Sequence, residues 1–189
     1  MGSEMCIRDR KKVAIFRHAR HQMDDKAKRL FYLSMVQSTA EYASNAYVHT
    51  LRVADYDRLV SACKQSLKII FGYPFTWPTD FILTSKKLHH PSLRFHLKLL
   101  VFIFHCTHGL ASPLLASSFT YRADTHHTNV CTRSQNTYIL SLPAAHSRYG
   151  FFNLSYLAAD RWNSLPLSIR SCTELPAFRA LCFNHLGAS

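Results

Sequence analysis

A ten-residue apolar run, Leu97 to Cys106, constrains the fold of this chain more than any other feature. Its sequence is LKLLVFIFHC, with Lys98 as the only charged residue. A helix needs about 20 apolar residues to span a bilayer, so this run is typical of a buried helix and not of a membrane span. Pro91 suits the first turn of such a helix, and Gly109 suits its end. We therefore predict a helix from Pro91 to about Gly109 that is apolar nearly all round and lies at the centre of a core.

Two further long helices are predicted upstream of this run. Between about Asp25 and Thr50, apolar residues recur every three or four positions without any Gly or Pro. A second stripe runs from Tyr56 to Phe71 and stops at Gly72. Three helices joined by short connections pack most simply as a helical hairpin with the third helix against it. A shorter helix, ending near Leu88, is expected between the second and third.

The pattern of apolar residues changes after about Pro113, where the helical periodicity is lost. Residues 138–143 (YILSLP) and 150–156 (GFFNLSY) alternate in the manner of two short strands around a turn. Helical sequence returns at residues 156–162 and again from about Glu174 to Leu186. The predicted fold is therefore mainly α, a helical bundle of three long helices followed by a small α+β C-terminal part with a short hairpin and a final helix.

The length of 189 residues and the 48% apolar content suit one substantial core with a small appendage. The first ten residues, MGSEMCIRDR, resemble translated cloning or adapter sequence. We expect residues 1–24 to be a foreign or disordered lead-in, residues 25–116 to form a helical domain, and residues 117–189 to form a small C-terminal α+β module.

Charge and cysteine usage narrow the class of protein. The formal net charge is +12 and the isoelectric point is about 9.7. Such a balance is common in chains that bind a polyanion, usually nucleic acid, although a basic surface without a ligand fits it too. The six cysteines are scattered and form no Cys-X-X-Cys pair, which favours reduced thiols in an intracellular protein that is not secreted.

Short motifs follow one another in a fixed order along residues 132–186. They are Thr132-Arg133, Leu142-Pro143, Tyr149-Gly150-Phe151, Trp162-Asn163-Ser164-Leu165-Pro166, Ile169-Arg170, Phe178 and Leu186. This order resembles the C-terminal, thumb and post-thumb, region of non-LTR retrotransposon (LINE-type, jockey-like) reverse transcriptases. Upstream, residues 30–47 are similar to the family's helix ending in Leu-Glu-Tyr-Cys, and residues 59–74 to its Leu-X-X-X-Gln-X-X-Ala-X-Arg-Ile-Ile helix. The resemblance covers roughly residues 26–186.

The resemblance implies a function without catalysis. The family holds its two Mg²⁺ ions with carboxylates of a palm domain that lies upstream of everything matched here. Asp24-Asp25 echoes the family's Tyr-X-Asp-Asp turn but lacks the aromatic residue, and acidic residues also suit a helix start. The chain is therefore expected to be a non-catalytic piece of an RNA-directed DNA polymerase, nuclear and cytoplasmic. Its expected partners are RNA or an RNA/DNA hybrid and the upstream polymerase domains, with no membrane, small-molecule substrate or cofactor.

Basic residues in or beside the second and third helices are the candidate nucleic-acid contacts. They are Arg58, Lys64, Lys68, Lys86, Lys87, Arg94 and Lys98. The alternative interpretation is an ordinary solvated helix face, with the whole chain a decayed or domesticated helical module that has no nucleic-acid activity or that binds a protein.

A second set of residues is expected to be structural. Trp162, with Leu157, Leu165 and Ile169 near it in sequence, most simply anchors the C-terminal part to the core, and a base-stacking platform is the alternative. By resemblance, the same structural set includes Tyr149, Gly150, Phe151, Pro166 and Phe178.

The sequence has no convincing arrangement of residues for zinc binding, for a Ser-His-Asp catalytic triad or for phosphate binding. Cys172, Cys182 and His185 have no fourth ligand for zinc, so buried thiols explain the cysteines better. A Ser-His-Asp set can be assembled only from scattered residues, and no glycine-rich phosphate loop is present in the sequence. We expect no metal site.

Overall fold

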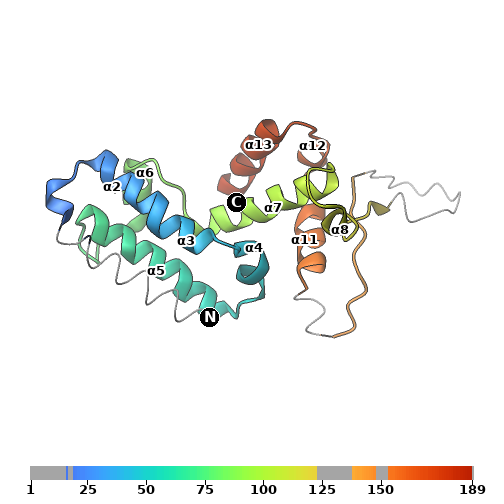
Figure 1. Ribbon diagram of the computed structural model, residues 1–189, viewed down its shortest axis with the longest axis horizontal. Coiled ribbons are helices and arrows are strands. Elements are labelled where there is room, and N and C mark those ends of the chain that lie inside the picture. Colours follow the sequence, from blue (N-terminus) through green and yellow to red (C-terminus); the bar gives the residue numbers. More distant parts are fainter. Residues whose placement is uncertain (1–15, 17–18, 123–137, 148–152, 189) are drawn as a thin grey trace, which may run out of the picture. The chain divides into compact units, whose positions relative to one another are not determined.

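The computed structural model describes residue 16 and residues 19–122, 138–147 and 153–188. These residues are mainly helical and include no β-strand, which confirms the mainly α prediction (Figure 1). Their one sheet-like feature is an isolated antiparallel bridge between Tyr121 and Leu140.

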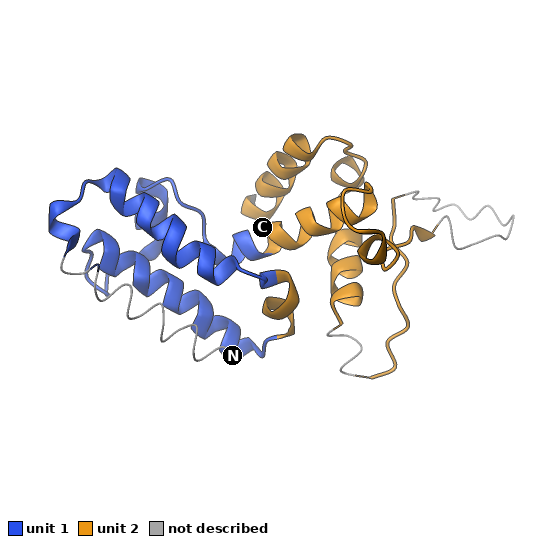
Figure 2. Ribbon diagram, viewed as in Figure 1, with its two compact units in different colours: residues 1–44, 51–95 blue, residues 45–50, 96–189 orange. Residues whose placement is uncertain are grey.

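The chain divides into two compact units (Figure 2). Unit 1 comprises residues 1–44 and 51–95, and unit 2 comprises residues 45–50 and 96–189. The division falls inside helix α7 (Pro91–Thr107), whereas the sequence analysis assigned that whole segment to a domain of residues 25–116. The apolar surface of α7 supplies the core of unit 2 from Leu99 onward.

Unit 1 begins with a helical segment that changes type along its length. Helix α2 (Asp25–Phe31) continues into the π-helical turn η2 (Tyr32–Gln37) and then into α3 (Ser38–Glu41). A short 3-10 turn, η1 (Arg20–Gln22), precedes it, so part of the expected lead-in is ordered. Upstream, Phe16 is buried and stacks on Phe31 with ring centroids 3.9 Å apart.

The single helix predicted from Asp25 to Thr50 is wrong in its second half. Tyr42 is extended and Ala43 has a φ of +51°, so the helix stops at Glu41 and resumes as two short pieces. These are α4 (Ser44–Tyr47) and the 3-10 turn η3 (Val48–Thr50). Neither Gly nor Pro marks the turn, so the local sequence carries no signal for it.

The second predicted helix is observed as α5 (Val53–Phe71), which runs alongside the α2 to α3 segment (Figure 1). Gly72 adopts a φ of +78°, a conformation that glycine takes without a steric cost. The backbone N–H of Tyr73 then donates to the carbonyl of Lys68 at 2.9 Å, which closes the helix end. Helix α6 (Thr79–Ser85) follows, with Pro78 at its N-cap.

The core of unit 1 joins η2, α5 and α6. Its buried members include Tyr32 and Val36 from η2, Leu67 and Ile70 from α5, and Ile82 from α6. The apolar periodicity of α5 therefore faces inward as the sequence pattern predicted.

Unit 2 is built around the second part of α7. Gly109, with a φ of +69°, ends this helix as predicted. No helix in the described part of the chain is long and apolar enough to cross a membrane. The other helices are α8 (Pro113–Ala116), α11 (Leu154–Asn163), α12 (Leu167–Arg170) and α13 (Leu175–Ala188).

Aromatic rings fill the core of unit 2. Phe178 of α13 lies 4.7 Å from the ring of Phe104 in α7 and 5.7 Å from that of Trp162 in α11. All three side chains are buried, together with Cys182. Burial raises the pKa of the Cys182 thiol to about 12, so this cysteine is an inert core residue.

The predicted hairpin is not observed in the described residues. Its second strand was placed at residues 150–156, but α11 already begins at Leu154 because Asn153 caps it, accepting a hydrogen bond from the Ser155 N–H at 3.1 Å. In the first strand, Leu140 pairs only with Tyr121. Residues 148–152 lie outside the described part of the chain.

Candidate functional site

Of the three predicted nucleic-acid contacts on α5, two have a bonding partner within the described residues and one does not. Arg58 lies 3.4 Å from Asp55 in an exposed ion pair, which is worth little in water. Lys68 donates from its Nζ to the carbonyl of Phe75 at 2.8 Å. Lys64, one helical turn before Lys68, is half-buried and makes no ion pair or hydrogen bond within the described residues.

Two further lysines lie just after α6. Lys86 is paired with Asp25 at 2.5 Å, with its Nζ also 5.3 Å from the centroid of the Phe71 ring. The hydrogen bond between them lowers the pKa of Asp25 and raises the pKa of Lys86. Lys87 is exposed, with a φ of +53°, and its side chain has no partner in the described part of the chain.

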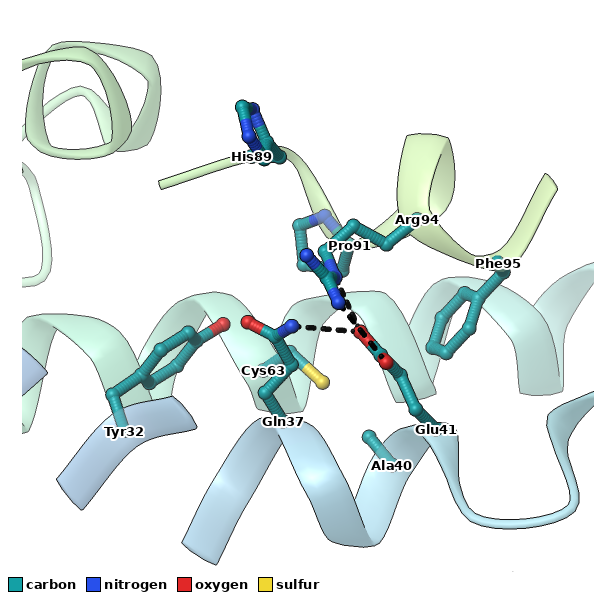
Figure 3. A pocket seen from close by; sticks show the side chains of 9 residues that line it. All are labelled: Tyr32, Gln37, Ala40, Glu41, Cys63, His89, Pro91, Arg94 and Phe95. Atoms are coloured by element: carbon teal, nitrogen blue, oxygen red, sulfur yellow. Dashed lines mark hydrogen bonds and ion pairs between the residues drawn. The ribbon is translucent and has the colours of Figure 1, made fainter. Parts of the chain in front are cut away.

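Arg94 is not a surface cation. Its guanidinium holds the carboxylate of Glu41 with two bonds, Nε to Oε1 at 2.5 Å and Nη2 to Oε2 at 3.2 Å (Figure 3). Gln37 donates to the same carboxylate at 2.8 Å. Glu41 is buried, so this ion pair is a structural link between α3 and the start of α7.

A small pocket surrounds this ion pair inside unit 1. Figure 3 shows Arg94, Gln37 and Glu41 converging beneath Pro91, with Tyr32 and Cys63 to one side. Burial raises the pKa of the Tyr32 hydroxyl, so it stays protonated. Because its polar groups bond to one another, the pocket is better explained as a satisfied buried network than as a ligand site.

The seven predicted cations therefore do not form one set. Lys98 belongs to unit 2, and the other six belong to unit 1. Within unit 1, Lys64 lies near enough to His90 to lower its pKa, in addition to the larger effect of burial. The positive charge of unit 1 includes these lysines around α5 and α6 and also Lys26 and Lys28 on α2.

An exposed aromatic group that was not predicted from the sequence lies in the loop between α5 and α6 and in the first turn of α6. No function was assigned to residues 73–81 from the sequence. Phe75, Trp77 and Phe81 are all exposed to solvent in the structure. Three aromatic residues within seven positions, next to two prolines, were the available signal.

The Trp-Asn-X-Leu-Pro motif forms a polar and apolar corner in unit 2, here called the Trp162 corner (residues 162–170). Trp162 has no exposed surface, and its Nε1 donates to the carbonyl of Tyr138 at 2.9 Å. The Asn163 amide bonds both backbone groups of Leu140, accepting from its N–H at 2.9 Å and donating to its C=O at 3.0 Å. The Asn163 side chain thus makes the two backbone hydrogen bonds to Leu140 that a neighbouring β-strand would otherwise make.

Arg170 completes the corner. It is buried, and it donates to the carbonyls of Leu165 at 3.0 Å and Tyr138 at 3.3 Å. Leu165 is buried and Pro166 precedes the first turn of α12. The remaining residues assigned to this structural set, Tyr149, Gly150 and Phe151, lie outside the described residues.

Other side chains that could take part in catalysis or metal binding are also held in structural contacts. Asp24 is the N-cap of α2, with its Oδ1 accepting from the Ala27 N–H at 2.8 Å. In unit 2, His49 lies beside His96 with ring centroids 5.9 Å apart. Burial lowers the pKa of His49 to about 4, helped by His96 and Arg161. Within the described part of the chain no three His, Cys, Asp or Glu side chains are placed to hold a metal ion.

Comparisons with known proteins do not place the chain in a family. No family model, curated protein or solved structure matches it. The resemblance to retrotransposon reverse transcriptases therefore rests on the order of the short motifs.

Proposed function

We propose that this chain is a non-catalytic C-terminal fragment of a retrotransposon RNA-directed DNA polymerase and that it contributes to binding RNA or the template-primer. The observation that carries the proposal is the uncompensated positive charge of unit 1. Lys64 and Lys87 have no acidic partner in the described residues, and the chain as a whole has a net charge of +12. Phosphates would supply the missing counter-charge.

The Trp162 corner supports the fragment assignment in a different way. Trp162, Asn163 and Arg170 all belong to motifs of the resembled family, and all make hydrogen bonds to residues 138–140 of the same unit. The same structural role, bonding to residues 138–140, thus accounts for several of the positions that match the family's motifs.

A helical module that binds protein instead of nucleic acid is the second candidate. It is favoured by isolated exposed apolar side chains such as Val53 on α5 and Leu114 on α8. Single exposed apolar residues are common on soluble proteins, so they support this alternative only weakly.

Charge reversal tests the proposal. The variant Lys64→Glu/Lys87→Glu removes two cations that make no ion pair within the described residues. It is expected to weaken binding to single-stranded and structured RNA alike, and to reduce the slope of log affinity against log salt by about one for each lost phosphate contact. Arg94 is left unchanged, because a carboxylate at that position would face Glu41 and unfold unit 1.

The matched control changes the same charge elsewhere. Arg161→Glu/Arg179→Glu replaces two exposed cations of unit 2 and alters the net charge equally. Equal losses of affinity in the two variants would show that only net charge matters. Absence of RNA binding by the parent chain at low salt would reject the proposal.

A further inference from the structure

The loop between α5 and α6, together with the first turn of α6, presents aromatic rings to solvent. Phe75 is 65% exposed, Phe81 is 55% exposed and Trp77 is 42% exposed. All of the large exposed apolar side chains in residues 72–90 are aromatic, since Ile82, Leu83 and Leu88 of the same stretch are buried. A concentrated exposed aromatic patch on a protein usually marks an interaction site.

The rings of Tyr73, Trp77 and Phe81 form a ladder of contacts that starts at the core. Tyr73 packs partly against the core of unit 1. The Trp77 ring lies 5.9 Å from the Tyr73 ring, and the Phe81 ring lies 6.1 Å from the Trp77 ring. Exposure of Trp77 and Phe81 is therefore fixed by contacts that begin in the interior.

Backbone contacts hold the loop in place. The Trp77 N–H donates to the Pro74 carbonyl at 3.0 Å, which makes a tight turn. Lys68 holds the Phe75 carbonyl at 2.8 Å from the side of α5. A ligand that docks on rings held in this way loses little conformational entropy in the protein.

Cations border the ladder. The ammonium of Lys68 has three donors, and its hydrogen bond to Phe75 uses one. Lys64 lies one turn earlier on the same side of α5, without an ion-pair partner in the described residues. Asp80 is the one acidic residue in the sequence from Gly72 to His90.

We propose that Phe75, Trp77 and Phe81 form a stacking platform for the bases of single-stranded nucleic acid, with Lys64 and Lys68 contacting its phosphates. This inference rests on the proposed RNA-binding function and names the part of the chain that carries it. Aromatic rings accept the face of any base, and adjacent lysines follow the backbone, so the platform selects single strands over duplexes without reading sequence. A duplex hides the base faces that the platform needs.

The test compares the full chain with Trp77→Ala, using fluorescence anisotropy of a labelled oligouridylate and of an RNA duplex. Loss of one stacked base is expected to weaken oligouridylate binding by about five- to one-hundred-fold. Duplex binding and the salt slope are expected to stay unchanged, because no phosphate contact is removed. Trp77→Phe keeps an aromatic face and is expected to recover most of the affinity.

Leu114→Ala is the matched control, since it removes an exposed apolar side chain in unit 2. It is expected to bind oligouridylate as the parent does. The melting temperature of each variant is measured alongside, so a folding defect is separated from a binding defect.

Three outcomes would overturn the platform. Parental affinity in Trp77→Ala, while Lys64→Glu/Lys87→Glu binds weakly, would reject the platform and leave the proposed function standing. No binding of either RNA by the parent would reject both. Partitioning of the parent into phosphatidylcholine/phosphatidylserine vesicles that is lost in Trp77→Ala, with RNA affinity unchanged, would assign the aromatic loop to a membrane surface.

Discussion

The two tryptophans of the chain occupy opposite environments. Trp162 is completely buried in unit 2, whereas Trp77 is 42% exposed in unit 1. Each lies close to a proline in the sequence, Pro166 and Pro78, so their immediate neighbours do not explain the difference. The difference lies in what each indole meets.

Trp162 meets both an apolar ring and a hydrogen-bond acceptor. Phe178 stacks near it, and the carbonyl of Tyr138 takes the indole N–H. Trp77 has ring contacts with Tyr73, in a tilted arrangement, and with Phe81, in a T-shaped one, and it remains 42% exposed. A buried indole needs its N–H satisfied, and the carbonyl of Tyr138, from another part of the chain, supplies that partner. The comparison shows that a tryptophan has a structural role where residues distant in the sequence cover its indole ring and bond its N–H.

The largest expected effect that tests this comparison is the loss of Trp162. Trp162→Ala removes a fully buried ring and leaves a cavity beside Phe178, which should lower the free energy of unfolding by about 3–5 kcal/mol. Urea denaturation followed by circular dichroism measures the change. A midpoint equal to that of the parent would show that the corner does not depend on its indole.

Asn163→Ala is expected to have the next largest effect. It leaves both backbone groups of Leu140 without the amide that bonds them, at a cost of about 1–3 kcal/mol. Asn163→Asp serves as a matched control, because it keeps the acceptor for the Leu140 N–H but loses the donor to the Leu140 C=O. Equal stability of Asn163→Ala and the parent in urea would show that water replaces the amide without loss.

The contrast between the two regions also shows how far the sequence leads. Apolar periodicity and Gly72 were enough to predict α5 and its end, and Gly109 was enough to predict the end of α7. These are local signals. The turn at Ala43 has no such signal, since a non-glycine residue with positive φ is rarely predictable from its neighbours.

Long-range polar contacts were the main features that the sequence could not provide. Arg94 was expected to contact nucleic acid because it is a basic residue of the predicted third helix, but its guanidinium forms an ion pair with Glu41, which lies more than fifty residues away in the sequence. The roles of Asn163 and Arg170 likewise depend on residues 138–140, whose position becomes known only in the folded structure.

A smaller effect is expected from pH, and it concerns unit 2. The pKa of His49 is lowered from 6.5 to about 4 in the folded state, with burial as the main cause. Its Nε2 is buried and has no hydrogen-bond partner among the residues that the structure describes, so protonation there would be unfavourable. The unfolded chain binds this proton at a higher pH than the folded chain. The stability from neutral His49 is therefore complete above about pH 6.5 and is lost as the pH falls toward 4.

The size of this loss is about 1 kcal/mol once the partial exposure of His49 is taken into account. Urea midpoints at pH 7, 5.5 and 4.5 measure it with Trp162 emission as the reporter, in a Trp77→Phe background. His49→Gln is expected to make the decline with pH shallower. Burial also lowers the pKa of His96, so some decline should persist. An unchanged decline in His49→Gln would assign the pH dependence to other groups.

The smallest expected effect is on the stability of Trp77→Ala, and it completes the comparison. Trp77 is 42% exposed and its ring neighbours are Tyr73 and Phe81, so its removal should change the free energy of unfolding by less than about 0.5 kcal/mol. Acrylamide quenching gives an independent check in single-tryptophan chains. Emission from Trp77 in Trp162→Phe should be quenched readily, and emission from Trp162 in Trp77→Phe should be protected until unfolding. A loss of stability in Trp77→Ala comparable to that in Trp162→Ala would mean that the aromatic ladder is part of the core of unit 1. The ring would then be unavailable for stacking, because a platform must be exposed in the folded chain before any base arrives.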